Sequence, residues 1–547
     1  MNQVVVECLI SSSLLICLLR MKLFNKRWIN MCVFFAFAVL ITVMIAVVFN
    51  RFFYFPYSPF ICIPILLFTV IGYYVYSPST GSGKAKKDED VFELMCEHGK
   101  ILFYYVRDNF LVYGGAGSGK TASIGKPLLE QYIKHHWAGF IYDYKDFDYT
   151  KTAYNLIQKY DYPYKLYQIS FTDMSRTHRF NPLKKTVIPD EEMLYQVIDD
   201  FLKAVAPKEA VKNDSGGWLN GATGLLRGVT VRFYRFKGEY EKFCTLPHIL
   251  QFMLLATPEE LTTFLEGDVV AKMQAGAFLG ARSSDRTRDS YVSTLNNYIS
   301  NIASNKKICY VLTGDDFDFY LNDPEEPKLF AVSNNFANES LISPIIAMLV
   351  PISARRIEFG NKVKFAYILD EMTTFRVNNF QAMPSVQREY GVSFLIMTQS
   401  SSKIESTYDA HDRASIESNC ANLFIGRTKD IKALENSPKY FGKEEKEKKS
   451  YSNGSSSGNH NSSITVSTQK EEIYDANVFA ELKQGEFILS AGQSNVKHLR
   501  TRFKKFELEE KPLPIIHLTS EKEVIENFEQ VGRDVERILM EMCGKGS

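Results

Sequence analysis

Two segments of the sequence contain Gly-Ser-Gly-Lys, the ending of a phosphate-binding loop. They lie at residues 81–84 and 117–120. A complete loop has the pattern GxxxxGK[ST]: backbone N–H groups surround the phosphates, the lysine reaches the β and γ oxygens, and the hydroxyl group binds Mg²⁺. The loop follows a buried strand and opens a helix, because the positive N-terminal end of a helix favours an anion.

The first copy does not meet these requirements. Pro78 stands where the first glycine belongs, and Ala85 replaces the hydroxyl residue. The neighbouring residues are polar and do not have the pattern of a strand. We therefore interpret this segment as a flexible, basic linker.

The second copy meets all of them. The segment "NFLVYG" predicts a short strand, and "ASIGKPLLEQYIKHH" has the apolar spacing of a helix, with Pro127 tolerated only near its first turn. The sequence therefore predicts a site for ATP and Mg²⁺, with Thr121 as a metal ligand. The nucleotide-binding residues are expected to be Gly114, Gly115, Ala116, Gly117, Ser118, Gly119, Lys120 and Thr121.

Two adjacent carboxylates, Asp370 and Glu371, follow the apolar run "VKFAYIL". An ATPase of this kind needs one carboxylate for Mg²⁺ and another to polarise the attacking water. We expect Asp370 to hold the metal through its water shell and Glu371 to act as the general base. Gln399 follows a further strand-like run, "GVSFLIMT", where it either senses the γ-phosphate or is simply the polar residue that ends a strand.

The order of predicted elements indicates how these residues are positioned. Strand-like runs alternate with helical or loop stretches, which predicts an α/β fold with a mostly parallel sheet covered on both faces. The runs are "AGFIYDY", "KLYQISF", "KLFAVSNN", "FAYILDE", "VSFLIMTQ", "NLFIGRT" and "EFILSAG".

Between residues 186 and 312 strand signals fade and helical patterns replace them. We expect an all-α insertion domain at 186–312, which divides the nucleotide-binding domain into a first part at 101–185 and a second part at 313–510. Within the second part, residues 443–470 are charged and then rich in Ser, Asn and Gly, which predicts a disordered loop. The remaining residues, 511–547, form a C-terminal tail with one amphipathic helix at roughly 520–542.

The N-terminal region predicts a transmembrane anchor of two helices at 28–77. Residues 28–50 carry no charge, and a second apolar run covers residues 59–76. At about 1.5 Å per residue such runs suit a hydrocarbon layer of about 30 Å. The alternative is a cleaved signal peptide followed by a buried helix, but paired apolar runs with basic flanks fit that alternative poorly.

Basic residues flank this anchor on both sides, which predicts its orientation. The positive-inside rule places both flanks, and everything after residue 77, in the cytoplasm. We therefore expect a two-pass protein of the cytoplasmic (inner) membrane, with a linker at 78–100 and its catalytic domain in the cytoplasm. Residues 1–27 are either a third membrane segment or, the interpretation we favour, an extension upstream of a natural start at Met21.

The composition argues against a basic surface spread over the whole protein and against a zinc site. The formal net charge is +1 for 547 residues, so any surface that binds DNA must be local. The nine cysteines include no CxxC pair and no Cys/His cluster, which favours reduced cysteines packed as small hydrophobic residues over a zinc site.

Together these motifs resemble the TraG/TraD-type coupling proteins of conjugative type IV secretion. The resemblance covers nearly all of residues 28–510. It is carried, in order, by the double membrane anchor, "GGAGSGKT", "FIYDYKD", "RFNPL", the helical insertion, "ILDEM" and "REYGVSFLIMTQS". The segments "SIGKPLLEQYI" and "YDYK" look most like the mobilisation-protein branch of the family.

The resemblance implies a hexameric, membrane-anchored, DNA-translocating ATPase with a P-loop NTPase domain of the RecA/FtsK-like type. It implies that Lys120 and Thr121 contact phosphate and Mg²⁺, and that Asp370 and Glu371 form the Walker B pair. It also implies that Gln399 is the sensor glutamine. One departure weakens the comparison locally, because the family's Asp-Pro-Lys-Gly reads Asp-Tyr-Lys-Asp at residues 143–146.

Arg388 matches the family's arginine finger, which enters the active site of the neighbouring subunit; the alternative is a solvated surface arginine. The catalytic residues would then be Lys120, Glu371, Arg388 and Gln399. The implied partners are single-stranded DNA bound without sequence preference, a relaxase or relaxosome, the channel proteins of type IV secretion, the membrane and five further copies of the chain.

A cluster of basic residues on the predicted helical insertion could face DNA or a relaxosome partner, although ordinary solvated helix faces explain it more simply. The cluster comprises Arg282, Arg286, Arg288, Lys306 and Lys307.

The favoured function is an ATP-driven pump that couples a relaxase-bound DNA strand to a secretion channel during conjugation or mobilisation. Two alternatives are a receptor ATPase for protein export by type IV secretion and an FtsK-like chromosome translocase. The latter usually has more membrane spans, a long linker and a DNA-reading end, none of which is evident in the sequence.

Overall fold

The structure is a computed structural model that describes residues 90–214, 217–456 and 459–544. The chain divides into two units, Met1–Asp88 and Glu89–Ser547. The expected N-terminal segment, the two-helix anchor and the first Gly-Ser-Gly-Lys copy lie outside the described residues. The account that follows therefore concerns the second unit.

A nine-stranded sheet organises this unit, in the order β13-β12-β9-β3-β8-β7-β4-β6-β5. The seven strands from β9 to β5 run parallel, whereas β12 and β13 join antiparallel at one edge. The expectation of a mostly parallel α/β sheet is therefore confirmed. The strands are β3 (Phe110–Tyr113), β4 (Ala138–Asp143), β5 (Lys165–Ile169), β6 (Lys328–Ser333), β7 (Phe365–Leu369), β8 (Val392–Thr398), β9 (Asn422–Gly426), β12 (Glu486–Ser490) and β13 (His498–Arg502).

The central strands are continuous apolar runs because both faces of the sheet are covered. Successive side chains of a strand point to opposite faces, so Phe110 and Val112 enter one core while Leu111 and Tyr113 enter the other. The first face is covered by α4 (Lys126–Lys134) and α5 (Asp148–Lys159), and the second by α15 (Glu339–Arg355) and α6 (Glu191–Val205).

Among the described residues, one stretch, Phe336–Arg355, is long and apolar enough to cross a membrane. It comprises a short 3₁₀ turn and α15, and most of it is buried in the interior of the protein. This burial is that of a core helix, and α15 packs against α6.

The described residues of 191–214 and 217–312 are helical apart from their connections. Thr257 and Pro258 divide the predicted run "LPHILQFMLLATPEELTTFLEG" into two helices, because Thr257 and Glu260 form a capping box that starts a new helix. The helices after α6 are α7 (Lys208–Lys212), α8 (Trp218–Tyr234), α9 (Leu246–Leu255), α10 (Pro258–Glu266), α11 (Val269–Gln274), α12 (Gly276–Gly280), α13 (Asp285–Ala303) and α14 (Lys306–Leu312).

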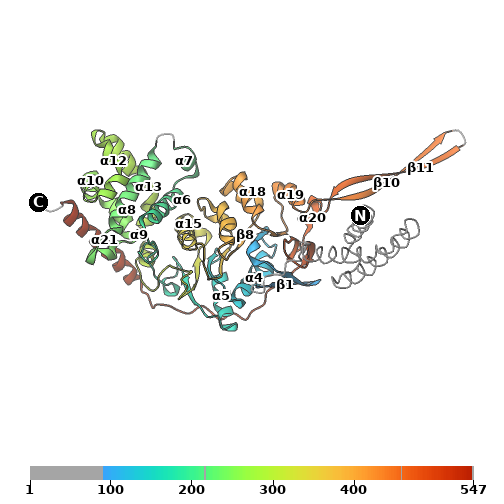
Figure 1. Ribbon diagram of the computed structural model, residues 1–547, viewed down its shortest axis with the longest axis horizontal. Helices are drawn as coiled ribbons and strands as arrows, with labels where there is room; N and C mark the ends of the chain where they lie inside the picture. The colour runs from blue at the N-terminus through green and yellow to red at the C-terminus, as the bar shows by residue number, and fades with distance from the viewer. Residues whose placement is uncertain (1–89, 215–216, 457–458, 545–547) are drawn as a thin grey trace, which may run out of the picture. The chain divides into compact units, whose positions relative to one another are not determined.

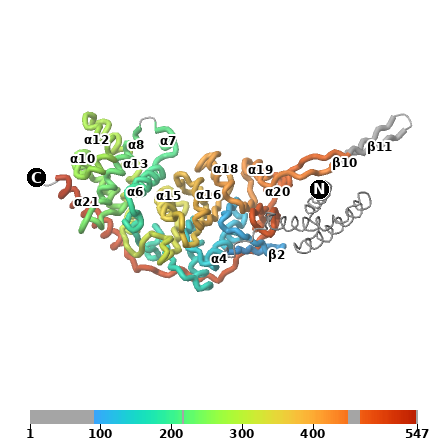
Figure 2. The backbone as a smooth tube through the Cα atoms, viewed as in Figure 1, coloured from blue at the N-terminus to red at the C-terminus, as the bar shows by residue number. Residues whose placement is uncertain are grey.

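The C-terminal tail is part of this helical region. The helix expected at roughly 520–542 is α21 (Glu521–Cys543), and it packs against α9, α10 and α14 (Figure 1). Residues 503–520, the C-terminal strap, reach it as an extended segment (Figure 2). The strap is hydrogen-bonded along its course: Phe506 N–H donates to Ala122 O, and Ile516 N–H donates to Ser175 O, both at 2.8 Å.

One expectation about a connecting segment is wrong. Residues 443–470 are not a disordered loop: the described residues form a hairpin of β10 (Lys443–Ser456) and β11 (Asn459–Glu472), which extends away from the large sheet in Figure 1. The register places lysine opposite glutamate near its base, as in Lys443 opposite Glu472, and such cross-strand pairs stabilise a hairpin.

The predicted linker at 78–100 contains structure as well. Its described end forms the hairpin of β1 (Phe92–Cys96) and β2 (Gly99–Phe103), whose Phe92 and Leu94 are buried beside α4. The short helices that complete the unit are α16 (Met383–Arg388), α17 (Ser401–Thr407), α18 (Ala410–Ser418), α19 (Ile431–Asn436) and α20 (Ala476–Glu481).

Candidate nucleotide-binding site

The phosphate-loop residues lie between β3 and a helix, as their pattern requires. The helix begins with one π-helical segment, Thr121–Gly125, and continues as α4. Gly117 and Gly119 have φ angles of 73° and 93°, which only glycine adopts readily. At Gly119 a side chain would also meet the backbone, because a Cβ there would lie 2.9 Å from Gly485 N.

Lys120 and Glu371 form a buried ion pair in the middle of this site. The lysine ammonium also lies 3.4 Å from the carbonyl oxygen of Gly114. Glu371 follows β7 with φ 50° and ψ 54°, a left-handed conformation that costs roughly 1–2 kcal/mol for a residue with a Cβ. The structure thus brings together the phosphate-contacting lysine and the general base predicted from the sequence.

Asp370 is buried, and neither of its carboxylate oxygens has a hydrogen-bond partner among the described residues. Burial, together with the charge of Glu371, raises its pKa to about 7 against the opposing charges of Lys145 and Lys120. An unsatisfied buried carboxylate is costly unless a cation or donors complete it. Asp370 therefore fits the water-mediated Mg²⁺ role expected of it, and Lys145, whose charge acts on Asp370, also contacts the Thr121 hydroxyl.

Lys145 also belongs to this site. Its ammonium donates to Thr121 Oγ1 at 3.2 Å. The loop that carries it is held by Asp143, which accepts hydrogen bonds from the Thr150 N–H and hydroxyl at 2.9 Å each and from the Lys145 N–H at 3.2 Å. Burial raises the pKa of Asp143. The departure from the family's Asp-Pro-Lys-Gly thus leaves the lysine at the phosphate loop.

Gln399 and Arg388 lie at opposite ends of β8, and therefore at opposite ends of the parallel strands of the sheet. Gln399 directly follows β8, whose last residue accepts a hydrogen bond from Gly114 N–H at 3.2 Å, so it emerges beside the phosphate loop with an exposed side chain. Arg388 precedes β8 and pairs with Asp108, just before β3, at 3.4 Å. Because β3 and β8 are parallel neighbours, Arg388 lies at the edge away from the phosphate loop of its own chain.

Arg427 is a further cation at the loop, and sequence reasoning did not single it out. Its carbonyl oxygen accepts the Gly115 N–H at 2.9 Å, and its guanidinium nitrogen would lie 3.6 Å from a Cβ at Gly117. The available signal was its place at the end of the strand-like run "NLFIGRT", beside the phosphate-loop strand in the sheet order.

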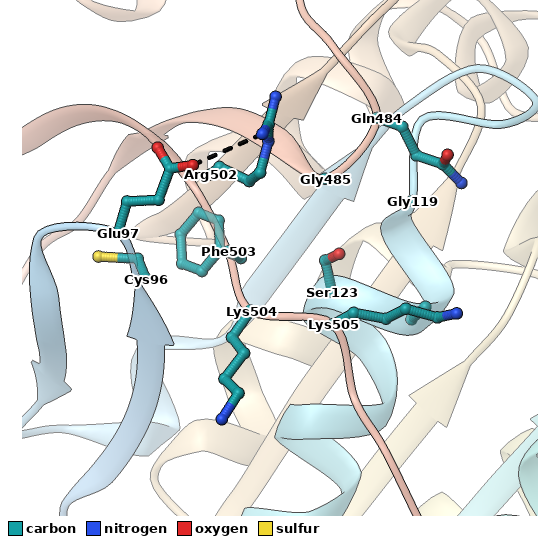
Figure 3. Close-up of a pocket in the computed structure, with 11 residues that line it drawn as sticks. Cys96, Glu97, Gly119, Ser123, Gln484, Gly485, Arg502, Phe503, Lys504 and Lys505 are labelled. Carbon is teal, nitrogen blue, oxygen red and sulfur yellow. Dashed lines mark ion pairs between the residues drawn. The ribbon is translucent and has the colours of Figure 1, made fainter.

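A pocket of about 470 Å³ opens beside the start of the helix that follows the phosphate loop. Ser123 lines one side and the Phe503 ring another, with the Arg502–Glu97 ion pair, 3.6 Å long, at its rim (Figure 3). Its walls come from segments far apart in the chain, including Gln484 and the first residues of the C-terminal strap. Such a composite wall has no local sequence signature.

Two kinds of comparison with known proteins, by family model and by solved structure, indicate the same group. Residues 364–484 match the family model described as the TraM recognition site of TraD and TraG. The solved structure of the bacterial conjugative coupling protein TrwBdeltaN70, in its unbound monoclinic form, superposes with a TM-score of 0.57 at 16% identity over 78% of this chain and 91% of that chain. The resemblance to TraG/TraD-type coupling proteins is confirmed.

The same fold is found in a TrwB structure that contains a bound nucleotide. The plasmid coupling protein TrwB in complex with ADP and Mg²⁺ matches with a TM-score of 0.53 and 16% identity, over 76% of this chain and 87% of that chain. No curated protein matches the chain.

Proposed function

We propose that the chain is a membrane-anchored, ATP-driven DNA translocase that couples a relaxase–DNA complex to a type IV secretion channel during conjugation or mobilisation. One observation carries the proposal: Lys120, Thr121, Asp370 and Glu371 converge at one edge of a sheet whose fold resembles that of TrwB. TrwB has been solved with ADP and Mg²⁺ and with a non-hydrolysable ATP analogue, which supports ATP and Mg²⁺ as the ligands here.

Phosphate binding would release the general base. The backbone N–H groups of the loop and the Lys120 ammonium attract the β and γ phosphates. As Lys120 turns to the phosphate oxygens, its ion pair with Glu371 opens, and the Glu371 carboxylate becomes free to orient a water molecule and accept its proton. Hydrolysis would therefore depend on prior binding of the triphosphate.

Mg²⁺ and the nucleobase would bind at different parts of the site. Thr121 Oγ1 and Asp370 would hold Mg²⁺, which neutralises charge on the β and γ oxygens when bound. Lys145, which donates to the same Thr121 oxygen, would yield that oxygen to the metal and remain close to the phosphates. The ribose and base would enter the pocket beside Ser123 and Phe503.

A homohexamer would complete each site. Arg388 lies at the sheet edge away from its own phosphate loop and is 47% exposed in its side chain, a placement that suits a finger reaching a neighbouring subunit. An arginine supplied in trans raises turnover by about 10³–10⁵ in NTPases that use one. Sequential hydrolysis around the ring would move a DNA strand through it, with the apolar runs at 28–77 as a two-pass anchor and the catalytic domain in the cytoplasm.

Transfer of the resident mobile element from donor cells tests this proposal. Donors carry the wild type, Lys120→Ala or Glu371→Gln, with matched protein levels in the membrane. We expect transfer to collapse in both variants while donor growth stays normal. Unchanged transfer would contradict the coupling function.

The same strains separate the two other functions. A receptor ATPase for protein export would show unchanged DNA transfer and reduced export of protein substrates, and an FtsK-like translocase would show defective chromosome segregation. The match to the TraM recognition region favours the coupling function and a relaxosome partner.

A further inference from the structure

A second cluster of charged side chains lies where the helical region meets the sheet. It comprises Lys203 at the end of α6, Lys208 and Lys212 on α7, and Arg376, which follows Glu371 by five positions. These four cations line a pocket of about 190 Å³. We refer to it as the basic pocket.

Positive charge in the basic pocket is not matched by ion pairs. Within residues 90–214, 217–456 and 459–544, none of the four cations lies within 4 Å of a carboxylate oxygen. Lys208 donates instead to the carbonyl of Ser406 at 2.6 Å, and Arg376 donates to the carbonyls of Lys203 and Ala206 at the end of α6. Burial and then the charges of Lys212 and Arg376 lower the pKa of Lys208.

Two carboxylates, Asp409 and Asp412, line the same pocket, and Glu209 lies on α7 between the lysines. One carboxylate oxygen of Asp409 accepts a hydrogen bond from the Asp412 N–H, because Asp409 caps the start of α18. The pocket also contains the exposed amide side chains of Asn378 and Asn379, which are uncharged donors. The cations thus exceed the carboxylates in a setting rich in hydrogen-bond donors.

The basic pocket is connected to the nucleotide site by a series of hydrogen bonds. The Thr373 hydroxyl meets the Thr398 hydroxyl at 3.1 Å, and Thr407 donates to the Thr373 carbonyl at 3.1 Å. Val377 N–H donates to the hydroxyl of Tyr408 at 3.3 Å. A ligand in the pocket would therefore touch the two segments that follow Glu371 and Gln399.

We propose that the basic pocket binds the phosphodiester backbone of a single DNA strand. This inference rests on the proposed function and adds the surface that grips the cargo. A translocase that moves any sequence must hold phosphates rather than read base edges, and lysine, arginine and asparagine side chains are suitable donors for that purpose. A phosphate contact beside the segment after Glu371 would also make hydrolysis respond to DNA.

The cluster expected from the sequence is a weaker candidate. Arg282 pairs with Glu266, and Arg288 pairs with Glu259 at 3.2 Å and with Asp285 at 2.7 Å. Lys307 donates to the carbonyl of Thr172 at 3.0 Å. Two of its five cations are therefore already neutralised by ion pairs, whereas the described residues of the basic pocket contain no such pair.

Binding of fluorescein-labelled oligothymidylate to the full chain, measured by anisotropy across a salt series, tests the inference. The test variant is Lys203→Gln/Lys208→Gln/Lys212→Gln, which leaves Arg376 in place because it caps α6. The matched control, Arg282→Gln/Arg286→Gln/Lys306→Gln, removes the same number of charges. We expect the test variant to lose about 2 from the slope of log K against log salt, at about 0.7 per lost single-strand phosphate contact, and the control to keep the wild-type slope.

A second variant, which is expected to bind more tightly, tests the inference even if the first variant misfolds. Asp409→Asn/Asp412→Asn keeps a capping side chain at α18 but removes two negative charges, so it should bind oligothymidylate several-fold more tightly. Equal slopes for wild type and test variant, or a loss confined to the control, would overturn the assignment of the pocket alone. A wild type that hydrolyses ATP but binds no oligothymidylate would overturn both this inference and the DNA-translocase function.

Discussion

The pairing of Lys120 with Glu371 makes each residue the other's main electrostatic partner. Both side chains are only 8% exposed. Removing one partner of a buried pair leaves an uncompensated charge, which typically costs about 3–5 kcal/mol. Loss of activity in a single variant can therefore come from unfolding as well as from chemistry.

A double-mutant cycle separates these causes. We expect Lys120→Met to lower the free energy of unfolding by about 3 kcal/mol, and Lys120→Met/Glu371→Gln to recover most of it, because the double variant no longer leaves Glu371 as an unpaired buried charge. Both variants should lack ATP hydrolysis. Urea denaturation provides the stabilities; additive losses in the double variant would show that the ion pair contributes nothing.

Asp90 provides a pH test away from the nucleotide site. Burial alone would raise its pKa, but hydrogen bonds from His135, Lys364 and Trp137, with the charge of Lys364, outweigh it and hold the pKa at about 2. A lowered carboxylate pKa adds stability above the unfolded value of about 3.8, and that stability is lost as pH falls towards about 2.

Asp90→Asn should therefore lower the free energy of unfolding at pH 7 by about 1–2 kcal/mol, a range reduced for partial solvent access. The gap between wild type and variant should narrow as pH falls below about 4. Denaturant titrations from neutral pH to pH 3 measure it. A gap that stays constant with pH would rule out the ion-pair origin.

At the residue scale, the sequence predicted the site residues that belong to a local motif. It did not predict the residues that come together from segments far apart in the chain. The spacing from Gly114 to Thr121 predicted the phosphate loop, and the apolar run before Asp370 predicted the pair of carboxylates at the end of a strand. Arg427 and the basic pocket depend on which strands are neighbours and how α7 meets the segment after Glu371, and neither relation is written in local spacing.

Among the elements, those with strong local patterns were predictable and those stabilised by partners were not. Buried parallel strands such as β8 are continuous apolar runs. In contrast, β13 has the sequence "HLRTR" and forms a strand because it pairs with β12 at the sheet edge. The hairpin of β10 and β11 was mistaken for disorder because its composition is polar, while its stabilising pairs lie across the two strands.

At the scale of elements, the packing of α21 against the helical region can be tested by substitution. Ile538 is fully buried against the helical region, whereas Met540, two positions on, is 55% exposed. We expect Ile538→Asp to release α21, because an unpaired carboxylate in this core costs several kcal/mol. Met540→Asp should change stability by less than about 0.5 kcal/mol. Limited proteolysis should cut the C-terminal strap rapidly in the first variant only; equal resistance in both would contradict the docking.

For the whole molecule, the most important feature is that Arg388 and the phosphate loop of the same chain lie at opposite ends of the parallel strands β3 and β8. A group at that end contributes to hydrolysis only across a subunit boundary, so catalysis would require a ring in which the same contact repeats. The sequence could supply the arginine and its resemblance to a finger. It could not supply the direction, which depends on the parallel alignment of β3 and β8.

Mixed oligomers test this relation directly. Arg388→Ala and Lys120→Ala should each lower ATP hydrolysis by about 10³-fold or more. When equal amounts are assembled together, about a quarter of the boundaries join an intact Lys120 site to an intact Arg388 neighbour, so activity should return to a readily measured fraction of wild type. An arginine that acts within its own chain would give no recovery on mixing, because no subunit carries both residues. A solvated surface arginine would leave the Arg388→Ala protein active on its own, so recovery on mixing is the outcome specific to a finger supplied by the neighbouring subunit.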